Sequence, residues 1–260
     1  MSAQGDGSDG GDRGDAGDEA LRFGPAVERA IVAAVDQAAR RRHRVFQTEH
    51  LLRGLLDEPE ARDILARCGA DDADLAALTQ DLDEYLDLVE PAPNAPRPRV
   101  DAACNTLLTR SAMLAKAAGR ALVGVDRVLE QLIAIPDAYA AMLLRAAGRD
   151  GIDRVDLRLV ISHGTREVTR EVPAAARLRV FLHNDDYTSM EFVVAVLTEL
   201  FGLPPKRAQA LMLEIHGGPP EAGVEIAELP AKDAVRRVAL VHDRARSQAF
   251  PLLCTLAAAS

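Results

Sequence analysis

Three side chains rich in hydrogen-bond acceptors follow one another at Asn184, Asp185 and Asp186. Their amide and carboxylate oxygens can accept several hydrogen bonds, and an ionised carboxylate has nothing to donate. A cluster of this kind suits a ligand with several N–H donors, such as an ammonium group. His216, at the end of a predicted helix, can add a further acceptor when its ring is neutral. These four residues are the candidate binding site of the sequence.

The elements on either side place the cluster at a strand-to-helix turn. The apolar run Leu178–Leu182, interrupted by Arg179, predicts a strand, and apolar residues at helical spacing follow over Phe192–Phe201. Thr188 and Glu191 stand in the Ser/Thr-x-x-Glu relation of a capping box, which predicts that Thr188 begins the helix. A helix N-terminus normally attracts anions. Acceptors gathered there therefore indicate a site for a donor-rich ligand.

Length and composition exclude several classes of protein. A chain of 260 residues allows about two domains. Its formal net charge of −9 argues against a nucleic-acid partner, because phosphate binding needs a basic surface. No apolar run reaches the roughly 18 to 20 residues of a membrane span, and the chain starts without an apolar leader, so we expect a cytoplasmic protein without membrane contact. Cys68, Cys104 and Cys254 are far apart and odd in number, which predicts buried free thiols and no metal site.

The apolar spacing in the first part of the chain predicts helices in two successive sets. The helix expected at Thr48–Leu56 recurs at Val125–Ile133, and Pro59 and Pro136 are each expected to open the helix that follows. A duplicated four-helix unit lets two apolar faces cover each other, which predicts a compact all-α domain. The predicted divisions are a disordered acidic tail (1–19), the helical domain (20–166, repeats at about 20–90 and 100–166), a linker (167–177) and a second domain (178–260).

Two motifs in the helical region carry a resemblance to a known family. Thr48–Leu52 (TEHLL) opens a helix, and Ile161–Arg166 (ISHGTR) closes the second repeat. With the two repeats, they make residues 20–166 similar to the N-terminal domain of the ClpA unfoldase, and the closing six residues are the most specific part. The chain contains no Gly-x-x-x-x-Gly-Lys-Ser/Thr phosphate-binding loop, so we expect no ATPase module.

Residues 178–260 resemble the ClpS adaptor family over their full length. Three blocks in order carry the resemblance: Asn184–Phe192, Leu211–His216 and Pro251–Leu256. The expected elements form a small α+β domain with a three-stranded antiparallel sheet and helices. They are strands at 178–183, near 223–229 and near 252–256, and helices at about 189–201, up to His216, and near 232–247.

The resemblance implies an adaptor that recognises a protein by its first residue, an N-degron, and hands it to a Clp unfoldase, without catalysis or a cofactor. It assigns the α-amino group to Asn184, Asp185, Asp186 and His216, and affinity is then expected to fall as acid protonates the histidine. It assigns the bulky apolar side chain of the first residue to a pocket in which Met190 excludes β-branched residues. The pocket would be lined by Thr188, Met190, Val193, Met212, Ile215 and Leu252.

Docking and regulation leave alternatives open. Glu228 and Arg237 match the acid and the base with which the family docks on the N-domain of a ClpA-like unfoldase. In the leading interpretation the chain delivers N-degron proteins to such a partner. In the alternative, the fused helical domain occupies the ClpS docking face, within one chain or across a dimer, and makes an autoinhibited or decoy regulator. A hydrolase using Asp185, Asp186 and His216 is a third hypothesis, which lacks an activated nucleophile.

Overall fold

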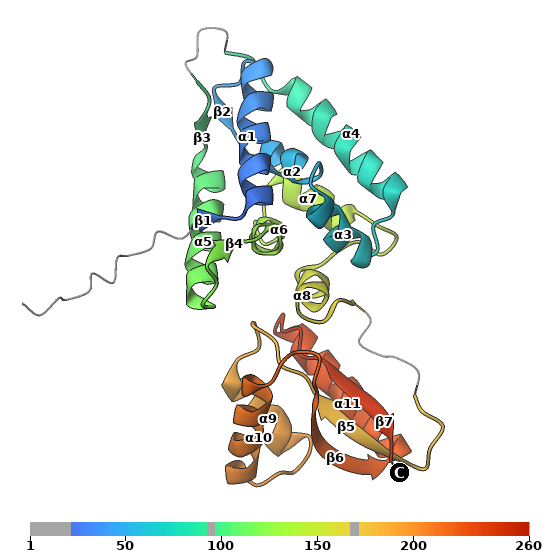
Figure 1. Cartoon of the computed structure of the whole chain (residues 1–260). Helices are drawn as coiled ribbons and strands as arrows, with labels where there is room; N and C mark the ends of the chain where they lie inside the picture. The colour runs from blue at the N-terminus through green and yellow to red at the C-terminus, as the bar shows by residue number, and fades with distance from the viewer. Residues whose placement is uncertain (1–21, 93–96, 167–171, 260) are drawn as a thin grey trace, which may run out of the picture.

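The computed structural model describes residues 22–92, 97–166 and 172–259, and Figure 1 shows a helical half followed by a half that contains a sheet. The predictions for residues 1–19 and for the first part of the linker, 167–171, lie outside these residues. The helical half has two sets of four helices. They are α1 (Pro25–Arg40), α2 (Thr48–Leu55), α3 (Pro59–Arg67) and α4 (Asp72–Leu88), then α5 (Ala102–Ala117), α6 (Val125–Ile133), α7 (Tyr139–Ala146) and α8 (Arg154–His163).

The second helix of each set supplies the centre of the helical core. Leu51, Leu52 and Leu55 on α2 have no exposed surface, and neither do Leu129 and Leu132 on α6. The registers of the two sets thus place equivalent leucines inside. This arrangement confirms the predicted all-α half in which two apolar faces cover each other.

Two short parallel strand pairs, too short for the sequence to predict, tie the repeats to each other. The strand before α1, β1 (Arg22–Phe23), pairs with the strand before α6, β4 (Leu122–Val123). The strand before α2, β2 (Val45–Phe46), pairs in the same way with the strand before α5, β3 (Arg99–Val100). Each pair therefore contains one strand from each repeat. A strand of two residues is too short to show the alternation of apolar and polar residues by which a strand is predicted from sequence.

The second half is the predicted three-stranded antiparallel sheet with helices. Its strands run in the order β6-β5-β7, with β5 in the centre. Leu178, Val180 and Leu182 alternate along β5 as fully buried residues, which is the period-two pattern of a half-covered strand. The elements are β5 (Arg177–Leu182), α9 (Met190–Glu199), α10 (Pro205–Gly217), β6 (Val224–Pro230), α11 (Ala231–Ser247) and β7 (Cys254–Ala258).

Three local predictions were wrong. Helix α9 is capped by Ser189, whose hydroxyl accepts from the Phe192 amide, because Thr188 donates its own hydroxyl to the preceding turn. Pro136 does not open α7, which begins at Tyr139, because the proline lies in the turn after α6, where its fixed φ fits equally well. The last strand was predicted two residues too early, because the buried residues before Cys254 have no strand structure.

Two further findings bear on the exclusions drawn from the sequence. The three cysteines are buried free thiols, as predicted, and burial raises the pKa of Cys68 and of Cys104 to about 12. None of the helices in the described ranges combines the length and the hydropathy that crossing a bilayer requires.

Each half contains a buried histidine whose role as an acceptor requires the neutral ring. In the helical half, His50 Nδ1 accepts from the Gln47 amide at 3.1 Å. In the other half, His242 Nε2 accepts from the Cys254 amide at 3.1 Å. Burial lowers the pKa of both rings to about 4.

These histidines predict that acid destabilises both halves between about pH 6.5, the usual histidine pKa, and pH 4. In that window the unfolded chain binds more protons than the folded one, so stability falls as pH falls. We expect protonation of each histidine to lower the unfolding free energy by on the order of 1 to 3 kcal/mol across the window. Urea unfolding at a series of pH values measures the loss. The variant His242→Gln keeps an acceptor but cannot titrate, so its unfolding free energy should fall less with falling pH than that of the native chain. A native chain whose unfolding free energy does not change across this pH window would contradict the prediction.

Candidate functional site

The turn between β5 and α9 is built around the carboxylate of Asp185, which is 7 % exposed. Its Oδ1 accepts from the Tyr187 amide at 2.8 Å and from the Thr188 amide at 2.7 Å. Its Oδ2 accepts from the Thr188 hydroxyl at 2.7 Å. Three donors satisfy most of a buried charge, and the backbone is folded back over residues 185–188 as a consequence. One acceptor position on the carboxylate remains for a ligand.

Asn184 links the turn to the end of α10. Its amide nitrogen donates to the His216 carbonyl at 3.3 Å and to the Gly218 carbonyl at 3.1 Å. Both N–H bonds of the amide are thereby used inside the protein, and its Oδ1 is left as an acceptor. The segment after α10 is held again by His183, whose ring bonds the Pro220 carbonyl at 2.9 Å.

His216 lies in the last turn of α10 with an exposed side chain. Within the described residues its ring makes no hydrogen bond, whereas its carbonyl is held by Asn184. The backbone is therefore fixed next to the turn while the ring is available as an acceptor.

The predicted polar and apolar residues meet in one pocket, with the exception of Asp186. The pocket is lined by His183, Asn184, Asp185, Thr188, Met190, Val193, Met212, Ile215, His216 and Leu252. Its free volume is about 20 Å³, which is room for about one water molecule. Met190, one of the lining residues, is 39 % exposed, and its unbranched side chain is flexible.

Three predicted residues lie elsewhere. Asp186 does not line the pocket and pairs with Arg120 of the helical half at 3.3 Å. Glu228 on β6 accepts from Arg177 Nε at 2.5 Å. Arg237 on α11 donates to the Leu200 carbonyl at 2.5 Å, so it stabilises the end of α9. Asp185 and His216 line the pocket and Asp186 does not, so the three residues of the hydrolase hypothesis do not meet there.

The sequence interpretation missed the contribution of the helical half to this region. The ring of Tyr187 is contacted by the guanidinium groups of Arg127 and Arg158. A hollow of about 480 Å³, lined by residues of both halves, lies next to His183 at the start of the turn. Its lining includes Arg67, Ser162 and His163 from one half and His183, Glu221 and Thr255 from the other. No spacing in the sequence indicates these contacts, because the partners lie far apart along the chain and belong to different domains.

Comparisons with known proteins divide the chain in the same way. Residues 22–147 match the family model described as the Clp repeat (R) N-terminal domain. Residues 174–255 match the model described as ATP-dependent Clp protease adaptor protein ClpS. The two matches follow each other along the chain, as the sequence resemblances predicted.

Curated relatives match the second segment. The ClpS adapter protein of Nitratidesulfovibrio vulgaris strain Miyazaki F is 51 % identical over 87 residues, which is 33 % of this chain and 83 % of the relative. The ClpS adapter protein of Edwardsiella ictaluri is 43 % identical over 91 residues, or 35 % of this chain and 82 % of the relative. Among solved structures, the Hsp104 N-terminal domain from Candida albicans aligns with a TM-score of 0.47 at 13 % identity, over 56 % of this chain and 97 % of that one.

The turn predicts unequal effects for its two neighbouring carboxylates. Asp185→Ala removes the acceptor for three donors inside the protein and should lower the unfolding free energy by about 1.5 to 3 kcal/mol. Asp186→Ala breaks one half-exposed ion pair and should cost less than about 1 kcal/mol. Urea unfolding of both variants at neutral pH measures the difference, and equal losses would contradict the assigned roles.

Proposed function

The chain belongs to the ClpS family of Clp protease adaptors, and we propose that it binds proteins through a free N-terminal amine and a bulky apolar first residue. It then presents them to a Clp unfoldase. The family membership supports the adaptor role and a Clp protease partner. The geometry of the turn supports the amine as the recognised group. Neither half is expected to catalyse a reaction.

An ammonium group has three N–H donors and no acceptor, so it needs about three acceptors that converge. The structure offers Oδ1 of Asn184, the remaining position on Asp185 and a ring nitrogen of His216, all on the wall of one pocket. The observation that carries the proposal is the orientation of Asn184. Because its nitrogen is committed to two carbonyls, its oxygen is the atom presented to a ligand.

The apolar part of the same pocket receives the first side chain. Val193, Ile215 and Leu252 are buried and form a fixed wall, whereas Met190 and Met212 can rearrange. A Leu, Phe, Tyr or Trp side chain is unbranched at Cβ and can pass Met190 before it widens. A β-branched Ile or Val is widest where the pocket mouth is narrowest, so it is disfavoured.

Glu228 and Arg237 remain the proposed docking pair for the partner unfoldase. In the alternative hypothesis the helical half covers this pair and makes an autoinhibited or decoy regulator. The contacts that join the halves instead include Asp186, Tyr187, Arg246 and the carbonyls of Ala249 and Pro251. The contacts of Glu228 and Arg237 are made within their own half. An adaptor with an accessible docking pair is therefore favoured over the autoinhibited form.

Peptide binding tests the proposed function directly. A fluorescent peptide that begins with Leu should bind the full chain, and N-acetylation of the peptide should weaken binding by at least about tenfold, because the charge and N–H donors are lost. Asn184→Ala and His216→Ala should weaken it by about as much, since each removes an acceptor. Glu214→Ala, an exposed neighbour of His216 on α10, serves as the control and should bind normally. Fluorescence anisotropy measures the binding of both peptides to the native chain and of the free peptide to the three variants.

Two outcomes would count against the proposal. An acetylated peptide that binds as tightly as the free one excludes recognition of the amine. If binding holds, a reporter protein that starts with Leu should be degraded faster by a Clp protease when the chain is added. Slower degradation would favour the decoy alternative.

The pocket mouth makes a separate prediction about selectivity. Met190→Ala should reduce the preference for Leu over Ile as first residue by about tenfold, because truncation opens the entrance to a β-branched side chain. Leu213→Ala, an exposed apolar truncation on α10, is the matched control and should leave the preference unchanged. Competition binding with peptides that differ only in the first residue measures the ratio. An unchanged ratio in the Met190 variant would exclude this residue as the size filter.

A further inference from the structure

Tyr187, within the proposed amine-binding turn, is held by two arginines of the helical half. The guanidinium carbon of Arg127 lies 4.9 Å from the centre of the Tyr187 ring, and that of Arg158 lies 4.6 Å from it. These are cation–π distances. The tyrosine hydroxyl is buried and has no hydrogen-bond partner among the described residues, and burial raises its pKa to about 12. The helical half therefore contacts Tyr187 through its ring and not through its hydroxyl.

The helical half also contacts the segment that leads into Leu252, a lining residue of the pocket. Arg158 donates to the Ala249 carbonyl at 2.5 Å, and His163 Nε2 bonds the Pro251 carbonyl at 3.1 Å. The next residue, Leu252, lines the pocket. With the Arg120–Asp186 ion pair, the helical half thus contacts the β5–α9 turn and the segment before Leu252, whereas the third segment that lines the pocket, the end of α10, belongs to the other half.

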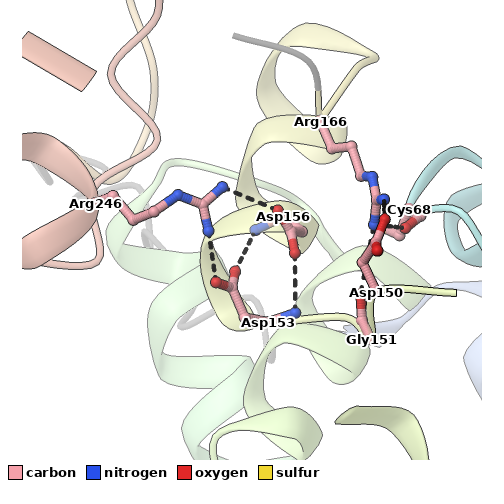
Figure 2. Close-up of polar contacts among 7 residues, drawn as sticks. All are labelled: Cys68, Asp150, Gly151, Asp153, Asp156, Arg166 and Arg246. Carbon is pink, nitrogen blue, oxygen red and sulfur yellow. Dashed lines mark hydrogen bonds and ion pairs between the residues drawn. The ribbon is translucent and has the colours of Figure 1, made fainter. Parts of the chain in front are cut away.

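A third contact holds α8, the helix that carries Arg158 and His163. Figure 2 shows Arg246 of α11 bonded to both Asp153 and Asp156, which cap the start of α8. The Arg246 guanidinium lies 2.6 Å from the first carboxylate and 3.1 Å from the second. Beyond the other end of α8, Arg166 donates to the Cys68 carbonyl at 2.7 Å and anchors that end in the helical half. Helix α8 is thereby held at a defined distance from the turn.

We propose that the helical half is an intramolecular clamp that pre-organises the amine-binding turn, with Arg127 and Arg158 as positioning residues. This inference rests on the proposed N-degron function and extends it to the fused domain. A turn held in its bound conformation loses less conformational entropy when the ligand arrives, so affinity rises. Undocking the halves frees Tyr187, whose amide donates to Asp185.

The clamp contacts the turn without covering the site. His216 is exposed and Met190 is 39 % exposed, and the lining of the pocket includes no residue of the helical half. One effect opposes the clamp, because undocking would release the Asp186 charge, which attracts an ammonium. That carboxylate is 51 % exposed, so water and salt screen most of its attraction. Loss of order in the turn is expected to dominate.

The matched pair Arg246→Glu and Arg244→Glu tests the clamp from the sheet-containing half. Arg246→Glu sets a third carboxylate against Asp153 and Asp156 and should loosen the junction. Arg244, on the same helix, pairs with Glu199 inside its own half, so its reversal is the control. We expect Arg246→Glu to speed amide hydrogen exchange at Tyr187 and Thr188 and to weaken binding of the Leu-initiated peptide by about three- to tenfold. Arg244→Glu should do neither.

The helical half supplies the second test. Arg127→Met keeps most of the side-chain volume but removes the cation, and it should reproduce both effects of Arg246→Glu. Arg127→Lys, which keeps a cation over the ring, should restore most of the affinity, a rescue that a purely structural role would not require. Far-ultraviolet circular dichroism of each variant confirms that it is folded.

The outcomes separate the clamp from the function on which it rests. Unchanged exchange in both Arg246→Glu and Arg127→Met overturns the clamp. Faster exchange with unchanged or tighter peptide binding overturns pre-organisation of the site. If the native chain binds no peptide with a free amine, the N-degron proposal fails, while the exchange data still decide whether the helical half orders the turn.

Discussion

A carboxylate that is 7 % exposed must be hydrogen-bonded nearby, and Asp185 finds its three donors within the next three residues. That local requirement folds the chain back on itself between β5 and α9. It also orients the neighbouring side chains, because Asn184 then reaches the end of α10 and Asp186 reaches the helical half. The site is thus a consequence of satisfying one buried charge. The ligand would add the last donor to a network that the protein has already assembled.

The two halves have separate hydrophobic cores, and the junction between them is made of polar contacts. The apolar cluster of the helical half ends at Val160, and that of the other half begins at Leu178. Arginines make most of the contacts at the junction. They donate to a backbone carbonyl, pair with carboxylates and lie over the ring of Tyr187. Guanidinium groups suit this task because they stack on aromatic rings and donate several bonds in a plane. Such a junction aligns two parts without merging their separate cores.

The junction reuses a feature that both helical repeats possess. The fourth helix of each repeat starts with a reciprocal aspartate capping box, Asp71–Asp74 in the first and Asp153–Asp156 in the second. Within the part of the chain that the structure describes, the second pair also binds an arginine of the other half, Arg246, and the first pair does not. The repeats have diverged in the same place, since α8 has 10 residues and α4 has 17. A cap that stabilises a helix end carries negative charge at the surface, and that charge is what the adaptor half contacts.

The sequence by itself determined the two halves, the repeated helices, the central strand and most of the residues that line the pocket. It could do so because these depend on periodicity and on motifs in which partners lie within a few residues, as Asn184 and Asp185 do. The helix cap was misplaced by one residue, because Thr188 and Ser189 are equally good caps until the Asp185 network claims one of them. Tertiary structure alone decided the partner of Asp186 and the arginine pair on Tyr187. Contacts between elements tens of residues apart leave no period in the sequence, and an arginine on a helix surface has the same local pattern whether it faces solvent or another domain.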